Sequence, residues 1–238
     1  MISRQEYAKW VEWATVNYLK IPKPMISDYD NWECRCSLGR YMYAAKNYEA
    51  AIPLLESVAD IEDAPIELEH QSTFNAPVEM QVWGLHNLAM AIWFVHKDAL
   101  LAYEYMKRAF LLSEKCEFYF HFVVRGQVWL NYLLFKAELG RRDEAEYETR
   151  ERLDKIKLNR GNSLYFYGYA FLARMAMQDG NAEQAMNLFK QGLNAYNLEE
   201  QDLELLAEAH DYCDNTEAFR RVWHLTEEPY RLWDEMDN

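Results

Sequence analysis

The sequence predicts an all-α protein, and three observations support that fold class. Glycine and proline are scarce, with 8 and 6 among 238 residues, about half their average usage. So few turn residues disfavour a β-sandwich or a β-barrel. Apolar residues make up half of the chain, including 17 Tyr, 11 Phe and 8 Trp, which suit the core of packed helices. Third, short blocks with helical periodicity return along the chain.

These blocks share a small residue that is followed four positions later by a large one. The clear pairs are Ala51 and Leu55, Ala102 and Met106, and Ala185 and Phe189, with weaker copies that begin at Ala145 and Ala218. In the clearest block an apolar stripe runs from Ala185 to Tyr196 at spacings of three and four, which is typical of an amphipathic helix. We expect the small residues to lie where two helices cross closely.

Each block follows a second helical segment, so the sequence predicts a series of helix pairs. The first segments span 32–46, 78–96, 117–139, 163–179 and 201–212. Gly140 and Gly180 stand where such a segment would end in a left-handed residue. Tight turns of this kind make successive helices antiparallel neighbours. The residues that we expect as N-caps of the following helices are Asn47, Asp143, Asn181 and Asn215.

Two spacings within the predicted helix pairs match a known repeat. Gly39 precedes Ala51 by twelve residues and Trp129 precedes Ala145 by sixteen, as in the pattern W-x2-L-G-x2-Y…A-x3-F. On these motifs the chain resembles the tetratricopeptide repeat (TPR) family over residues 30–226. The resemblance implies a right-handed superhelical stack of about five antiparallel helix hairpins, a TPR-like α-solenoid. The key alanines lie 51, 43, 40 and 33 residues apart, against about 34 in the family, and residues 62–76 are expected to form an inserted loop.

Capping helices are expected at both ends of this single domain of residues 1–238. Residues 1–29 contain an amphipathic helix from Ser3 to Lys20. The proline-containing segment that follows would end this helix. Residues 227–238 include Pro229 at the start of a last short helix. Terminal caps are expected because the ends of a repeat stack need a polar outer face to stay soluble.

Charge and cysteine content restrict the partners and the compartment. The formal net charge is −14, which argues against nucleic acid and against anionic membranes. Residues 199–238 hold 13 acidic residues and 3 Arg, and we expect a solvated face there or a docking surface for a basic partner. Four cysteines in a chain of this length form no disulfide framework. With no 18-residue apolar run and no signal-like start, we expect a cytoplasmic protein without membrane association.

No motif of catalysis or of cofactor binding is present in the sequence. The chain lacks a glycine-rich phosphate loop, G-x-S-x-G and H-E-x-x-H. The six histidines fall in different segments, and the pair closest to an acid and base, Glu69 and His70, lies in the predicted loop. We therefore expect no enzymatic activity, no metal and no cofactor.

The TPR resemblance also implies a concave surface lined by the first helix of each pair. By alignment with the family, arginines there would hold a carboxylate, amides would pair with a peptide backbone, and aromatic rings would form apolar walls. The predicted groove residues are Arg40, Tyr43, Asn87, Phe94, Gln127, Asn131, Tyr167 and Arg174, with Cys36 and Met177 beside them.

Several functions stay open at this point. The leading expectation is a non-catalytic adaptor or scaffold that binds a peptide or a partner helix in this groove. An acidic TPR-type chaperone or sequestering regulator of a client protein is the alternative, and an enzyme with a site between long helices is a third. The groove residues could also pack against the chain's own capping helices. Trp223, Tyr230 and Trp233 exceed what capping alone would bury, which allows a homodimer.

Overall fold

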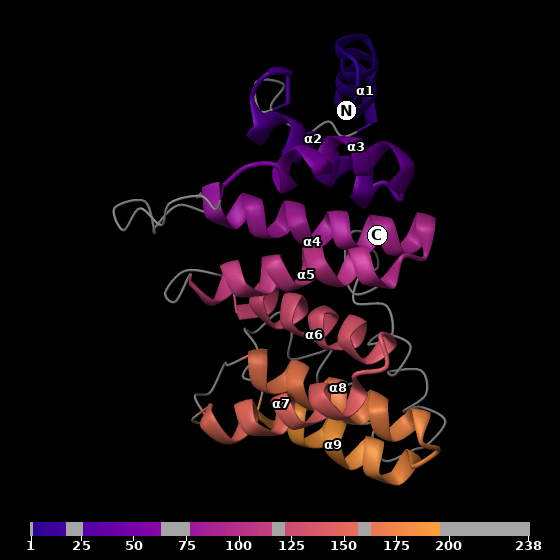
Figure 1. Ribbon diagram of the computed structural model, residues 1–238, viewed down its shortest axis with the longest axis vertical. Helices are drawn as coiled ribbons and strands as arrows, with labels where there is room; N and C mark the ends of the chain where they lie inside the picture. The colour runs from indigo at the N-terminus through magenta and orange to yellow at the C-terminus, as the bar shows by residue number, and fades with distance from the viewer. Residues whose placement is uncertain (1, 18–25, 63–76, 116–121, 157–162, 196–238) are drawn as a thin grey trace. The chain divides into compact units, whose positions relative to one another are not determined.

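The computed structural model describes residues 2–17, 26–62, 77–115, 122–156 and 163–195, and all of their regular structure is α-helical (Figure 1). The all-α prediction is thus confirmed for the described residues. Their nine helices are α1 (Arg4–Asn17), α2 (Trp32–Ala44), α3 (Tyr48–Ala59), α4 (Pro77–His96), α5 (Ala99–Glu114), α6 (Phe122–Glu138), α7 (Arg142–Lys155), α8 (Ser163–Gln178) and α9 (Ala182–Ala195).

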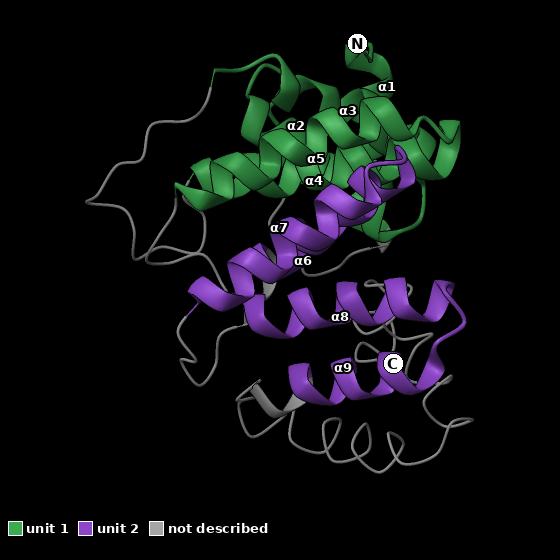
Figure 2. Cartoon of the chain, turned by 60° about the horizontal axis from the view of Figure 1, so that its bottom comes forward, with its two compact units in different colours: residues 1–120 green, residues 121–238 purple. Residues whose placement is uncertain are grey.

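The helices form two compact units, residues 1–120 and residues 121–238 (Figure 2). In the first unit, α1 contacts α2, α2 contacts α3 and α4, and α4 also contacts α3 and α5. In the second unit, α6 contacts α7 and α8, and α8 also contacts α7 and α9. Helices that are neighbours in sequence therefore pack together within each unit. The predicted inserted loop after residue 62, the fifth repeat and the C-terminal cap lie outside the described residues.

The small residues of the repeated blocks occupy the positions that the sequence predicts. All four alanines of the described blocks are completely buried, as are Leu55 and Met106. A Cβ atom at Gly39 would lie 2.7 Å from Cγ of Leu55. Because no side chain would fit between α2 and α3 at this point, glycine allows the two helices to cross closely. These alanines are Ala51, Ala102, Ala145 and Ala185.

The N-terminal helix α1 buries one side against the rest of the first unit, as its sequence pattern predicts. Tyr7, Val11 and Ala14 are buried, and α1 contacts α2. The hydroxyl of Tyr7 donates a 2.7 Å hydrogen bond to the carbonyl of Ile26, and that of Tyr29 donates one of 2.8 Å to the carbonyl of Ile2. These two bonds fasten the helix to the segment that precedes α2.

A left-handed residue lies in the turn of every described helix pair. It comes one or two residues after the end of the first helix, with φ of 61° at Lys46, 55° at Lys97, 77° at Gly140 and 76° at Gly180. At Gly180 the two backbone bonds of a Schellman motif are present, from Gly180 N to Met177 O and from Asn181 N to Ala176 O. The sequence predicts the left-handed conformation at the two glycines but not at the two lysines.

The N-cap predictions are confirmed at two positions and wrong at a third. Asn47 accepts from the amide of Ala50 and Asn181 from that of Gln184. Asp143, in contrast, lies inside the first turn of α7, whose N-cap is Arg141 without a side-chain capping bond. The cap falls one residue after the left-handed glycine, so position 141 corresponds to Asn181. The Asp143 carboxylate instead interacts favourably with the positive end of the helix dipole. Asn215 lies outside the described residues.

We expect Lys46→Gly to raise the free energy of unfolding by about 0.5–1 kcal/mol. A left-handed conformation costs a lysine about 1–2 kcal/mol, of which the greater entropy of glycine in the unfolded chain cancels part. Gly140→Ala is the matched opposite change, because a Cβ atom there meets nothing within 4 Å and only the backbone angle is strained. Urea denaturation followed by circular dichroism should show opposite shifts for the two variants, and shifts of equal sign would contradict this reading of the turns.

Candidate functional site

The predicted groove residues come from the first helices of the pairs, four in each unit. Arg40 and Tyr43 lie on α2 and Asn87 and Phe94 on α4, two helices that contact one another in the first unit. In the second unit, α6 carries Gln127 and Asn131 and the adjacent α8 carries Tyr167 and Arg174. Each set of four therefore lies on one pair of neighbouring helices.

Arg40 is held over an aromatic ring of the neighbouring helix. Its guanidinium carbon lies 5.5 Å from the ring centre of Trp83 on α4, and both side chains are half-buried. Such a cation–π contact orients an arginine while its N–H donors stay available to a carboxylate. The Trp83 ring in turn packs edge-on against His86 at 5.6 Å, so that the arginine stands above a defined aromatic support.

A layer of buried polar side chains lies in the same helices. His86 is completely buried and its Nδ1 lies 3.1 Å from Oδ1 of Asn87. Burial, together with the positive charge of Arg40, lowers the pKa of His86 to about 4, so the imidazole is neutral near pH 7. The thiol of Cys36 donates to the carbonyl of Met80 at 3.4 Å, and burial raises its pKa to about 12. The His86 ring therefore carries no charge near pH 7, and Cys36 is not a thiolate nucleophile.

A chain of aromatic rings continues the surface toward the end of α4. Tyr43 lies 5.2 Å from Tyr48, whose ring stacks on Phe94 at 4.7 Å. Phe94 keeps 36% of its surface exposed, while Tyr43 is buried. The ammonium of Lys97 lies 5.9 Å from the centre of the Phe94 ring. Among these three aromatic rings, Phe94 is therefore the one that a ligand would contact first.

Four side chains thus form what we call the α2–α4 surface: Arg40, Trp83, Tyr48 and Phe94. Trp83 and Phe94 are eleven residues apart, so they lie on one face of α4 and are separated by about 16 Å along its axis. The cation stands at the Trp83 end and the exposed ring at the other. Arg40 and Phe94 are predicted from the sequence, whereas Trp83 and Tyr48 are not, although the spacing of four between Trp83 and Asn87 places both on one helix face.

The amides predicted to pair with a peptide backbone are largely enclosed. Asn87, Gln127 and Asn131 expose only 6%, 4% and 2% of their surfaces. Tyr167 is also buried, and a Cβ atom at Gly126 would lie 2.1 Å from its ring, which shows how closely α6 and α8 cross. Arg174 is half-buried. Among the predicted residues, a ligand would therefore reach Arg40, Phe94 and Arg174 more readily than the amides.

The second unit carries another arginine–tryptophan pair, which is not predicted from the sequence. Trp129 of α6 is completely buried, and the guanidinium carbon of Arg152 on α7 lies 4.9 Å from its ring centre. The same ring approaches Gly168, where a Cβ atom would lie 3.0 Å from it. Trp129 is therefore enclosed by α6, α7 and α8 and contributes to packing rather than to a ligand surface.

Two other kinds of site are absent from the described part of the chain. None of its helices is long and apolar enough to cross a membrane. Groups of three or more His, Cys, Asp or Glu placed to hold a metal ion are likewise absent from the described ranges.

Comparison with known proteins adds no relative. No protein-family model, curated protein or solved structure matches the chain. The likeness to tetratricopeptide repeats is therefore a prediction that depends on the chain's own motifs.

Proposed function

We propose that the chain is a non-catalytic interaction module built as a TPR-like α-solenoid, which binds a peptide or a partner helix through the first helices of its pairs. Three features of the described residues support the repeat architecture. A left-handed residue lies in the turn of all four described pairs, the block alanines are completely buried, and neighbouring helices pack in sequence within each unit.

The observation that carries the binding proposal is the α2–α4 surface. It combines an oriented cation, Arg40 over Trp83, with an exposed ring, Phe94 stacked on Tyr48. Such an arrangement suits a carboxylate at one end and a large apolar side chain at the other. A separation of about 16 Å corresponds to about five residues of an extended peptide or about eleven residues of a helix.

The spacing makes the proposal testable with a designed peptide set. Peptides would carry one glutamate and one leucine or phenylalanine separated by two to twelve residues, and fluorescence anisotropy would measure their affinity for the full chain. We expect binding to peak at spacings near five for extended peptides or near eleven for helical ones. We also expect Arg40→Ala to weaken binding about tenfold, because a charge-assisted hydrogen bond to the carboxylate is lost.

Arg4→Ala is the matched control for this test. Arg4 also stands over an aromatic ring, 5.1 Å from the centre of Tyr29, but it lies on α1 and pairs with Asp30. It should leave peptide affinity unchanged, whereas Phe94→Ala should weaken it at all spacings. Peptides that bind Arg40→Ala and Phe94→Ala as tightly as the natural chain, with unchanged circular dichroism, would exclude this surface as the binding site.

A further inference from the structure

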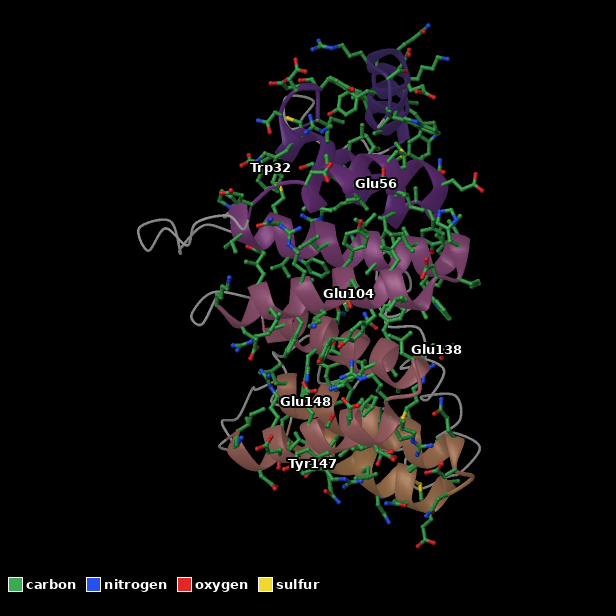
Figure 3. All side chains as sticks on the ribbon, viewed as in Figure 1. Trp32, Glu56, Glu104, Glu138, Tyr147 and Glu148 are labelled. Carbon is green, nitrogen blue, oxygen red and sulfur yellow. The ribbon has the colours of Figure 1, made fainter. Side chains whose placement is uncertain are left out.

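The outer face of α5 exposes two leucines that the first unit does not bury. Leu100 and Leu111 keep 61% and 52% of their surfaces exposed. Glu104, which lies between them in the sequence, is exposed as well and is labelled in Figure 3. The opposite face of α5 packs on α4 through Ala102 and Met106, which are completely buried. Two separate exposed leucines need no explanation by themselves, but the charged residues between them give this face a distinct pattern.

The residues of this outer face follow a self-complementary order. Their spacings of three and four place them on one stripe of the helix, which we call the α5 stripe. Its chemistry reads leucine, acid, base, leucine along the chain. The four residues are Leu100, Glu104, Lys107 and Leu111.

Turning this order around a twofold axis between residues 105 and 106 matches every position with its complement. In an antiparallel pair of α5 helices, Leu100 would face Leu111 of the second copy. Glu104 would face Lys107 of the second copy. Since the twofold axis repeats each of these contacts, two leucine pairs and two pairs of opposite charge result, as an isologous interface requires.

We propose that the α5 stripe is the contact surface of a homodimer in which two copies of the chain pack their α5 helices antiparallel. Charge complementarity selects this occupant, because parallel helices in register would place glutamate against glutamate and lysine against lysine. One helix face is small for an interface, so the dimer is weak, with a Kd of about 10–100 µM. This inference is independent of peptide binding at the α2–α4 surface.

Charge reversal tests the proposed register directly. Sedimentation equilibrium of the full chain from about 1 to about 500 µM should show reversible dimers. Glu104→Lys alone and Lys107→Glu alone should each raise the Kd about tenfold or more, because each places like charges opposite one another. The double variant with both changes should dimerise again, and an equimolar mixture of the two single variants should form heterodimers.

The control exchanges the same two residue types at the same spacing elsewhere. Lys9→Glu and Glu12→Lys affect exposed residues of α1 and should leave the Kd unchanged. Leu111→Ser should abolish dimers without altering net charge, with circular dichroism used to check the fold of every variant. A natural chain that stays monomeric up to about 500 µM, or dimers that persist in Glu104→Lys or are not restored by the double variant, would overturn the proposal.

Discussion

Replacing Phe189 with alanine should lower the stability of the α8–α9 hairpin by about 3–5 kcal/mol. Phe189 is 2% exposed and forms a cluster with three buried alanines, Ala173, Ala176 and Ala185. Its ring packs edge-on against Phe166 at 5.7 Å. The three alanines have no rotatable side chains that could move into the space of a missing ring. Met177, Met186 and Leu188 also pack against the cluster and can fill part of that space, so only part of the cavity should remain open.

Hydrogen exchange of the full chain, read by mass spectrometry on peptides of α8 and α9, measures this loss locally. Phe189→Leu should lose much less, about 1.5 kcal/mol or below, because most of the apolar volume is kept. Tyr147→Ala in the same unit is the surface control, since Tyr147 is 71% exposed and should change stability by less than about 0.5 kcal/mol. Equal effects of Phe189→Ala and Tyr147→Ala would contradict the cluster.

The packing of Phe189 is one of the features that the sequence predicts, and the reason is local. A small residue and a large one separated by four positions must lie on the same helix face, so Ala185 and Phe189 identify the buried side of α9 without knowledge of its neighbours. The same reasoning places Ala51 and Leu55 in the core. Gly140 and Gly180 predict left-handed residues in the turns because glycine adopts that conformation readily.

Features that depend on distant or surrounding groups are not predicted. Lys46 and Lys97 adopt the left-handed conformation, yet lysine gives no signal for it. The guanidinium of Arg108 on α5 donates to the carbonyls of Ala59 and Ile61, each at 2.6 Å, and thereby binds the end of α3 from 47 or more residues away. Spacing along one helix carries no information about such a partner.

The candidate site shows the same division between helix faces and their surroundings. Helical periodicity and the family alignment place Arg40, Asn87 and Phe94 on first helices that lie side by side. They cannot tell which of these side chains are covered, because exposure depends on tertiary neighbours. Arg40 therefore turns out to be half-buried over Trp83, whereas Asn87 is buried beside His86.

Acidification should weaken the first unit, because His86 is buried in its neutral form. Burial, with a smaller effect of the Arg40 charge, lowers its pKa from 6.5 to about 4. Below pH 6.5 the unfolded chain therefore binds a proton that the folded chain does not. Above pH 6.5 this proton has no effect on the free energy of unfolding. As the pH falls below 6.5, the free energy of unfolding decreases by about 1.4 kcal/mol per pH unit. At pH 4 the folded chain begins to bind the proton too, and the loss levels off at about 3 kcal/mol.

Hydrogen exchange on peptides of α4 at several pH values, corrected for the intrinsic exchange rate, should reveal this slope. The informative range is pH 6.5 to 5, because carboxylates add their own protonation at lower pH. His86→Gln removes the titrating ring, so its α4 stability should be nearly independent of pH in this range, even if the variant is less stable throughout. His96→Gln, which changes an exposed histidine at the end of the same helix, should retain the slope of the natural chain. A slope that persists in His86→Gln would show that another group is responsible, and the buried imidazole would then have no part in the acid sensitivity of the first unit.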